Sequence, residues 1–500
     1  MTRQEIQKRI EELGSKQQFI IAEMTRLGFW TQHDEPIPAE LVAQDAALQK
    51  ELSQLLERQR RFQSRDAMLK EMRQARMAAA KQRRIETKQR REAARKARAE
   101  AWQATLATAI PYLGDGNPAA LANHTADSAR LAQFGLPQFE SPLALATAMK
   151  LSLSELRFLA YNRAVSTVSH YKRFHLTKKS GGKRLISAPM PRLKKAQLWV
   201  LENILNKVQP TEHAHGFRAE RSILTNALPH VGQDVVINID LKNFFPTVSY
   251  ARVKGLLAKL GYSEAIATVL ALLCTEPDTQ ALQVDGKTYH VGNGSRHLPQ
   301  GAPTSPALTN LLAYRLDRRL NGLARAFGYV YTRYADDLTF SATGSVASQA
   351  NQLIWAVEQI VQGEGFVVHP DKISVMRKGQ QQRVTGIVVN QKASIDRATL
   401  RRFRALLHQI GQTGWEGKSW GSPAPEADIR QVVLGYAHFV QMVKPELGRT
   451  LVANIRELIN GRPVAAVANP VEPQPTSDPI LTVTTPTPVA NPAKDWWDIF

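Results

Sequence analysis

In the first hundred residues, apolar side chains recur at the three- and four-residue spacing of helices. One set is Ile6, Ile10 and Leu13, and another is Leu41, Leu48, Leu52 and Leu55. The segment HDEPIP, residues 33–38, interrupts this pattern with two prolines. The pattern predicts a mostly extended helical region over residues 1 to about 105, either a helical hairpin or two separate helices.

Beyond about residue 142 the pattern is that of a mixed α/β chain. Residues 234–240, DVVINID, form a short apolar run that is typical of a buried strand. Residues 328–342, GYVYTRYADDLTFSA, alternate in period two on both sides of a tight turn, which predicts a hairpin. The Pro-, Gly- and Asn-containing residues 107–141 predict a connector. Residues 463–500, rich in Pro, Thr and Val without a period, predict a disordered tail.

Composition adds a strong basic excess to this picture. The 500 residues carry a net charge of +21 with a pI near 10.0. Nucleic acid is the first partner that such a charge favours, and an acidic membrane surface is the second. No apolar run reaches the roughly 20 residues of a membrane span, and the polar N-terminus does not resemble a signal peptide. Cys274, the single cysteine, excludes an internal disulfide and a multi-cysteine zinc site, so we expect a cytoplasmic protein.

The basic excess is concentrated in residues 81–98, KQRRIETKQRREAARKAR, which hold nine basic and two acidic side chains. A solvated face of a helix or coiled coil would explain this composition. A helix that follows nucleic-acid phosphates would explain it as well, and the one-sided charge favours that interpretation.

Asp336 and Asp337 lie at the tip of the predicted hairpin, and Asp240 ends the predicted strand. If the two strands are neighbours, three carboxylates converge, and they need cations to offset their repulsion. Magnesium prefers oxygen ligands, and two such ions about 4 Å apart can stabilise the attacking and leaving oxygens of phosphoryl transfer. Decoration of an ordinary turn is the alternative for Asp336 and Asp337, because Asp is common in turns.

The motifs around these acids resemble the palm motifs of reverse transcriptases. In order they are NIDLKNFFPTV (residues 238–248), LPQGAPTSPALTNL (298–311), YADDLTFS (334–341), GFVVHPDKI (365–373) and RVTGIVV (383–389). Upstream, KKSGGKRLISAP (178–189) is similar to the basic fingers segment that contacts the triphosphate. The resemblance covers about residues 142–461.

Two further stretches resemble the retron branch of that family. NALPH, residues 226–230, matches the NAxxH signature of retron enzymes, and residues 384–386 match their VTG triplet. An ordinary polar helix end is the alternative explanation for Asn226 and His230. Residues 1 to about 105 and the last 38 residues have no counterpart in this resemblance.

The resemblance implies an α+β right-hand polymerase with fingers, a palm with a small antiparallel sheet, and a helical thumb. The expected divisions are a basic helical extension (1–106), a connector (107–141), fingers (142–230), palm (231–395), thumb (396–462) and a Pro-rich tail (463–500). In the thumb, GYAHFVQMVKPE (435–446) interleaves aromatics with a lysine, which suits either an RNA grip or a buried helix.

The resemblance also implies roles for individual residues. Asp240, Asp336 and Asp337 are the expected catalytic metal ligands for two Mg²⁺ ions, with the Leu241 carbonyl as a further ligand. The expected nucleotide-binding residues are Lys183, Arg184, Phe245, Gln300, Gly301 and Lys372. The expected RNA- and primer-binding residues are Asn226, His230, Val384, Thr385 and Gly386.

Two of these side chains have specific expected tasks. Phe245 would block a ribonucleotide 2′-OH, and Lys372 would protonate or neutralise the leaving pyrophosphate. Their alternatives are a core phenylalanine, for which Phe244 is the better candidate, and a plain surface lysine.

The implied function is an RNA-directed DNA polymerase that copies part of a cognate structured non-coding RNA. Priming from an internal 2′-OH of that RNA would give a branched RNA–DNA hybrid, and the system would serve in anti-phage defence. The expected partners are the RNA, its RNA–DNA product, dNTPs and a separate effector protein, with no membrane. The alternatives are a scaffold that restrains an effector through its RNA–DNA product, and an intron-type or phage-exclusion reverse transcriptase.

The last residues, DWWDIF (495–500), place two tryptophans and a terminal phenylalanine after a proline-rich tether. Large apolar side chains are costly to leave in water, and docking onto a partner protein is one explanation for them. Packing of the tail back onto the protein's own surface is the alternative.

Overall fold

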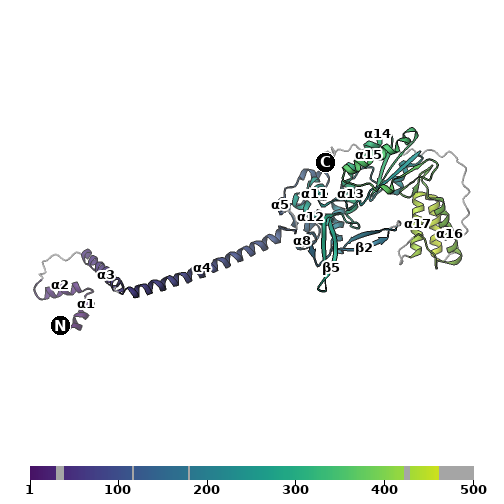
Figure 1. The fold of residues 1–500 in the computed structure, drawn as a ribbon. Coiled ribbons are helices and arrows are strands. Elements are labelled where there is room, and N and C mark those ends of the chain that lie inside the picture. The colour runs from purple at the N-terminus through teal and green to yellow at the C-terminus, as the bar shows by residue number, and fades with distance from the viewer. Residues whose placement is uncertain (30–38, 63, 115–117, 178–180, 422–427, 461–500) are drawn as a thin grey trace. The chain divides into compact units, whose positions relative to one another are not determined.

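The computed structural model describes residues 1–29, 39–62, 64–114, 118–177, 181–421 and 428–460 (Figure 1). The predicted break at 33–38 and the predicted tail at 463–500, DWWDIF included, lie outside the described residues. The chain divides into two units, Met1–Ala101 and Trp102–Phe500. None of the helices in the described ranges is both long and apolar enough to cross a membrane.

The N-terminal unit is helical, as its periodic pattern predicts, but the described residues form four helices rather than a hairpin or two helices. Its helices are α1 (Arg3–Glu12), α2 (Lys16–Arg26), α3 (Ala39–Phe62) and α4 (Arg65–Thr108), the last of which continues into the second unit. Thr2 forms a capping box with Glu5 at the start of α1, and Ser15 caps α2. Helix α4 has 44 residues, no Gly or Pro and no buried side chain. Its stability therefore comes from the helix propensity of its Ala, Arg, Gln, Lys and Glu residues.

A four-stranded antiparallel sheet, called the central sheet here, organises the second unit. Its strands are, in spatial order, β7 (Val330–Tyr334), β8 (Asp337–Ala342), β4 (Val235–Asp240) and β9 (Ser374–Arg377). Strand β4 lies between β8 and β9, which explains why its apolar run is buried. The structure confirms the predicted strand at 234–240 and the predicted hairpin at 328–342.

Helices around the central sheet complete the larger of two apolar cores. They are α11 (Tyr250–Lys259), α12 (Glu264–Cys274), α13 (Ser305–Leu312), α14 (Tyr314–Ala326) and α15 (Ala350–Gly363), with the 3₁₀ turns η3 (Gly344–Gln349) and η4 (Pro370–Lys372). All but the first residue of α12 are buried, so the longest apolar run of the chain is a core helix.

Short helices and small sheets make up the rest of this part of the second unit. The helices are α5 (Pro118–Ala122), α6 (Ser128–Gln133), α7 (Pro142–Ala148), α8 (Leu153–Ala160), α9 (Pro191–Asn203), η1 (Leu205–Lys207), α10 (Ile223–Ala227) and η2 (Leu228–His230). Strands β2 (Tyr171–Thr177) and β3 (Lys183–Pro189) form an antiparallel hairpin. Strands β1 (Val165–Ser166), β5 (Glu276–Val284) and β6 (Lys287–His297) form a sheet in the order β1-β6-β5. All of these elements except β5 and β6 precede β4 in the chain.

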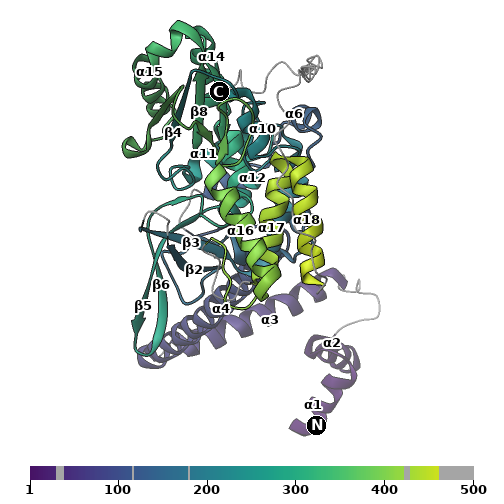
Figure 2. The same cartoon turned by 90° about the vertical axis from the view of Figure 1, so that its right-hand side faces the viewer.

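The second core belongs to three C-terminal helices, which lie side by side in Figure 2. They are α16 (Arg397–Thr413), α17 (Ile429–Val443) and α18 (Pro445–Ile459), and a small hairpin of β10 (Arg383–Val384) and β11 (Ile387–Val388) precedes them. Helices α17 and α18 meet closely at Gly448, where an added Cβ would lie 2.0 Å from the Gln441 Cα. Tyr436 of the predicted RNA-gripping stretch packs against Phe403, with ring centroids 4.6 Å apart. This packing favours the buried-helix interpretation for that aromatic residue.

Candidate active site

The central sheet brings the three predicted carboxylates to one end. Asp240, the last residue of β4, is the register partner of Asp337, the first residue of β8. Asp336 occupies the turn between β7 and β8, and its carbonyl accepts a hydrogen bond from the Leu241 amide at 2.9 Å. Ala335 precedes it with φ of 58°, a left-handed conformation that tightens the turn. The antiparallel pairing of β4 with β8 therefore places the acids together.

The charges of these acids are only partly compensated by the protein. Burial, followed by the neighbouring carboxylates, raises the pKa of Asp337 to about 6. Burial and the charge of Asp240 also raise the pKa of Asp336, and the cations Arg184 and Lys372 offset this rise only in part. Lys372 Nζ lies 2.8 Å from Asp240 Oδ2 and is half-exposed. The site thus has an excess of buried negative charge.

This donor set suits a hard divalent cation, because carboxylate oxygens are its preferred ligands and added positive charge would offset the repulsion. Across the described residues, however, no three His, Cys, Asp or Glu side chains form a preformed ligand cage. Lys372 holds one Asp240 oxygen, so a cation that uses this oxygen would compete with the Lys372 ammonium.

A buried ion pair supports the turn from the side of the core. The side chains of Arg333 and Asp317 are 0% exposed, and their closest N–O distance is 2.7 Å. Arg333 Nη1 also donates to the Ala335 carbonyl at 3.1 Å and to Asn310 Oδ1 at 2.9 Å. Gly216 approaches the same turn so closely that an added Cβ would lie 2.6 Å from the Ala335 amide nitrogen. These contacts fix the backbone that carries Asp336.

The sequence contains a partial indication of this buried ion pair, which was not among the predicted features. Arg333 is the one charged residue in the strand VYTRY, and so is a candidate for a buried, paired charge. Its partner could not be predicted, because Asp317 lies on α14 and reaches Arg333 only through the tertiary fold.

A cavity of about 1110 Å³ opens beside the carboxylates. Asp240, Leu241 and Asp336 line it, whereas Asp337 is not among the lining residues. All six predicted nucleotide-binding residues also line it: Lys183, Arg184, Phe245, Gln300, Gly301 and Lys372. The structure therefore gathers cations, an aromatic ring and carboxylates around one space.

Gln300 and Gly301 are held against β3. The Ser187 amide donates to the Gln300 carbonyl at 2.7 Å. Gly301 has φ of 120°, and an added Cβ would lie 3.0 Å from the Ser187 carbonyl oxygen. A side chain at position 301 would therefore be strained, which explains why glycine occupies this wall of the cavity.

The two adjacent phenylalanines have different environments. Phe244 is 3% exposed and belongs to the core, as the sequence predicts for that member of the pair. Phe245 is half-buried and lines the cavity. Phe217, which the sequence analysis missed, also lines the cavity, is 56% exposed, and lies 6.3 Å from Phe245 between ring centroids. Its φ of 58° is unusual for a bulky residue.

The residues predicted to bind RNA or primer lie elsewhere. Asn226 and His230 are 0% exposed. The prediction that their side chains contact nucleic acid directly is therefore wrong for this structure. His230 Nδ1 lies 2.6 Å from Ser341 Oγ and Nε2 lies 2.8 Å from Thr332 Oγ1. Burial lowers the pKa of His230 to about 3, so the imidazole is neutral. His230 thus links η2 to β7 and β8.

The second retron-like stretch adjoins the first. Val384 is buried and belongs to the same apolar core as Ala227. Thr385, at a φ of 47°, donates from Oγ1 to the Ile223 carbonyl at 3.2 Å. The turn at Thr385 and Gly386 is therefore fixed to α10, although Gly386 itself is exposed. The buried residues of this contact region are Asn226, Ala227, His230 and Val384, and we call them the buried seam. Val384 cannot contact nucleic acid through its side chain, because packing surrounds it.

The sequence of this chain is similar to those of known proteins over the region that contains the site. The profile of the family described as "Reverse transcriptase (RNA-dependent DNA polymerase)" matches residues 176–389. The Retron Mx162 reverse transcriptase of Myxococcus xanthus is 46% identical over 338 residues, which cover 65% of this chain and 68% of that protein. The Retron Ec86 reverse transcriptase of Escherichia coli is 34% identical over 333 residues, which cover 66% of this chain and 92% of that protein.

Among solved structures, telomerase from Candida albicans in complex with a fragment of telomeric RNA is similar, with a TM-score of 0.35 and 12% identity. The match covers 59% of this chain and 57% of the telomerase chain, less than two thirds of its length. At this TM-score and identity, the similarity to telomerase carries no conclusion about function.

Proposed function

The chain belongs to the retron-type reverse transcriptases and is an RNA-directed DNA polymerase, and we propose that it polymerises DNA at Asp240, Asp336 and Asp337. The observation that supports this site is the pairing of Asp240 with Asp337 beside a cavity that basic and aromatic side chains line. We also propose the division into fingers (142–230), palm (231–395) and thumb (396–462), of which the central sheet forms the palm.

In this proposal the residues of the cavity bind and orient the incoming dNTP. Lys183 and Arg184 hold the triphosphate through charge-assisted hydrogen bonds. The backbone at Gln300 and Gly301, held against β3, forms a further part of the cavity wall. Phe245 lies where a 2′-OH would be rejected. Lys372 neutralises or protonates the leaving pyrophosphate once it is released from Asp240.

Two Mg²⁺ ions held by Asp240, Asp336 and Asp337, with the Leu241 carbonyl as a further oxygen, would supply charge stabilisation for the attacking and leaving oxygens. The protein's own contribution is to fix these acids. The Arg333–Asp317 pair holds the turn that carries Asp336, so the acids meet the substrate without rearrangement of the backbone.

We propose the finer function on the basis of the similarity to retron enzymes. The template is part of a cognate structured non-coding RNA, the primer is an internal 2′-OH of that RNA, and the product is a branched RNA–DNA hybrid. The biological role is anti-phage defence together with a separate effector protein, and the protein acts in the cytoplasm.

The structure of the product tests this finer function. Full-length protein is incubated with its cognate RNA and dNTPs, and the product is separated under denaturing conditions. The expected DNA remains covalently joined to RNA and is released by a 2′-5′ debranching enzyme. DNA with a free 5′ end that the debranching enzyme does not alter would contradict 2′-OH priming, while leaving polymerisation itself intact.

A further inference from the structure

Helix α4 carries nine basic and two acidic residues between positions 81 and 98, and all of these positions are exposed. Five of the basic residues follow one another at spacings of four, three, four and three: Arg84, Lys88, Arg91, Arg95 and Arg98. Residues three and four apart share one face of a helix, so these five form a line about 21 Å long. We call this line the basic stripe.

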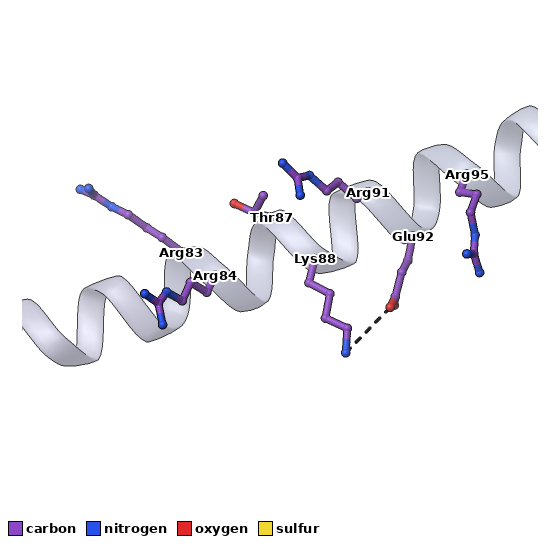
Figure 3. A pocket seen from close by; sticks show the side chains of 7 residues that line it. All are labelled: Arg83, Arg84, Thr87, Lys88, Arg91, Glu92 and Arg95. Atoms are coloured by element: carbon purple, nitrogen blue, oxygen red, sulfur yellow. Dashed lines mark ion pairs between the residues drawn. The ribbon is translucent and has the colours of Figure 1, made fainter.

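Figure 3 shows the middle of the basic stripe. The Cα atoms of the stripe follow one face of the helix, but the side chains spread from it. Those of Arg83 and Arg91 extend to one side, and those of Arg84, Lys88 and Arg95 extend to the other. The open groove between them has a volume of about 450 Å³. Glu92 also lines the groove, 4.0 Å from Lys88. Because exposed side chains of a single helix bound this groove, it cannot enclose a small molecule, but it can lie along an extended polyanion.

The side chains of residues 81–98 disfavour other partners. A coiled coil needs apolar residues at alternating spacings of three and four, and here those positions repel a second basic helix. Ile85 is the only large apolar residue in this range, so the helix has no face that could enter a membrane. The range contains no aromatic side chain on which unpaired bases could stack. A duplex backbone fits these properties best.

We infer that the basic stripe binds the phosphate backbone of a nucleic-acid duplex without regard to its sequence. This contact is separate from the polymerase cavity, and it lies outside residues 176–389, which match the reverse transcriptase family. It gives the enzyme a second, salt-sensitive hold on the base-paired parts of a structured RNA or of its RNA–DNA product.

The test compares two full-length variants with equal loss of charge. The stripe variant replaces Arg84, Lys88, Arg91 and Arg95 by Gln, and the control variant replaces Arg65, Arg76, Arg90 and Lys96 by Gln. Gln keeps helix propensity, and circular dichroism checks that both variants retain their helix content. Binding to a blunt RNA duplex of arbitrary sequence, and separately to a DNA duplex and to single-stranded RNA, is measured by fluorescence anisotropy over a range of salt.

Loss of four phosphate contacts should lower the slope of log affinity against log salt by about 3 to 4 in the stripe variant. Duplex affinity should fall at least about tenfold more than in the control variant. An equal fall in duplex affinity in both variants would show that only the total charge of the helix matters, and not the position of the stripe. Unchanged duplex affinity in both variants would assign the stripe to an acidic protein partner. A larger loss of affinity for single-stranded RNA than for duplex would exclude duplex recognition. Each of these results overturns the inference, and primer extension by the same variants shows separately whether the polymerase site is intact.

Discussion

The cavity beside Asp240 and the buried seam contain the residues of the clearest sequence motifs. Motif side chains are accessible in the cavity and enclosed in the buried seam. In the cavity, Asp336, Lys183, Arg184 and Phe245 face a space large enough for a nucleotide. In the buried seam, Asn226 and His230 are fully enclosed. A recognisable motif therefore marks a position of importance without saying whether its side chain meets a ligand or the core. The comparison predicts that substitutions in the two regions affect activity and stability in different proportions.

The largest expected effect concerns the pair that supports the cavity. Arg333→Met leaves Asp317 buried without its main partner, which should lower the free energy of unfolding by about 3–5 kcal/mol. Lys254→Met, which breaks the partly exposed pair with Glu264, is the control and should cost about 0–1 kcal/mol. Urea unfolding measures both. The double variant Arg333→Met with Asp317→Leu should regain part of the loss, and a single-variant loss no larger than the control's would contradict this account.

The next effect concerns His230 in the buried seam. The folded pKa near 3 lies below the value of about 6.5 expected for an unfolded histidine, so the unfolded state binds the proton first as pH falls. His230 therefore makes stability fall by up to about 1.4 kcal/mol per pH unit below pH 6.5, until pH reaches about 3.

Replacement by Gln should remove this dependence while it leaves affinity for RNA at pH 7 unchanged in the folded protein. Unfolding free energies at pH 7 and pH 5 measure the first effect, with His438→Gln on the exposed face of α17 as the control. A loss of RNA affinity in folded His230→Gln protein, without a change in the pH dependence, would return His230 to the RNA-binding surface.

The smallest effect in free energy concerns Phe245. Phe245→Ala should lower discrimination against ribonucleotides at least about tenfold, or roughly 1.4 kcal/mol, because a steric block in the cavity is removed. Incorporation rates for a dNTP and the matching rNTP measure it. Phe244→Leu is the matched control, since Phe244 lies in the core and should affect stability without affecting discrimination. Equal discrimination by Phe245→Ala and the wild-type protein would assign Phe245 to the core as well.

Local pattern was sufficient to predict β4 and the β7–β8 hairpin, because period and turn chemistry fix these features. The meeting of Asp240 with the acids of the turn was predicted only if the two strands are neighbours, and the resemblance to reverse transcriptases supplied that condition. Local pattern was not sufficient to predict that the residues of the buried seam are enclosed. Burial of His230 depends on Thr332 and Ser341, which lie more than 100 residues away in the chain. Phe217 was missed for a similar reason, because its place beside Phe245 is set by the tertiary fold. The match of NALPH to the retron signature implied contact with RNA, whereas Thr332 and Ser341 on the sheet are the partners of His230 inside the protein.

The polymerase assignment of the three acids is tested most directly by single-nucleotide incorporation on an RNA template with a DNA primer. The wild-type protein is compared with Asp336→Asn/Asp337→Asn and with Asp285→Asn, an exposed turn residue whose left-handed conformation Asn tolerates. The account predicts that the double variant folds and binds the primer–template but incorporates nucleotide at least about a thousandfold more slowly, a barrier increase of about 4 kcal/mol. Incorporation at the wild-type rate by the folded double variant would contradict it.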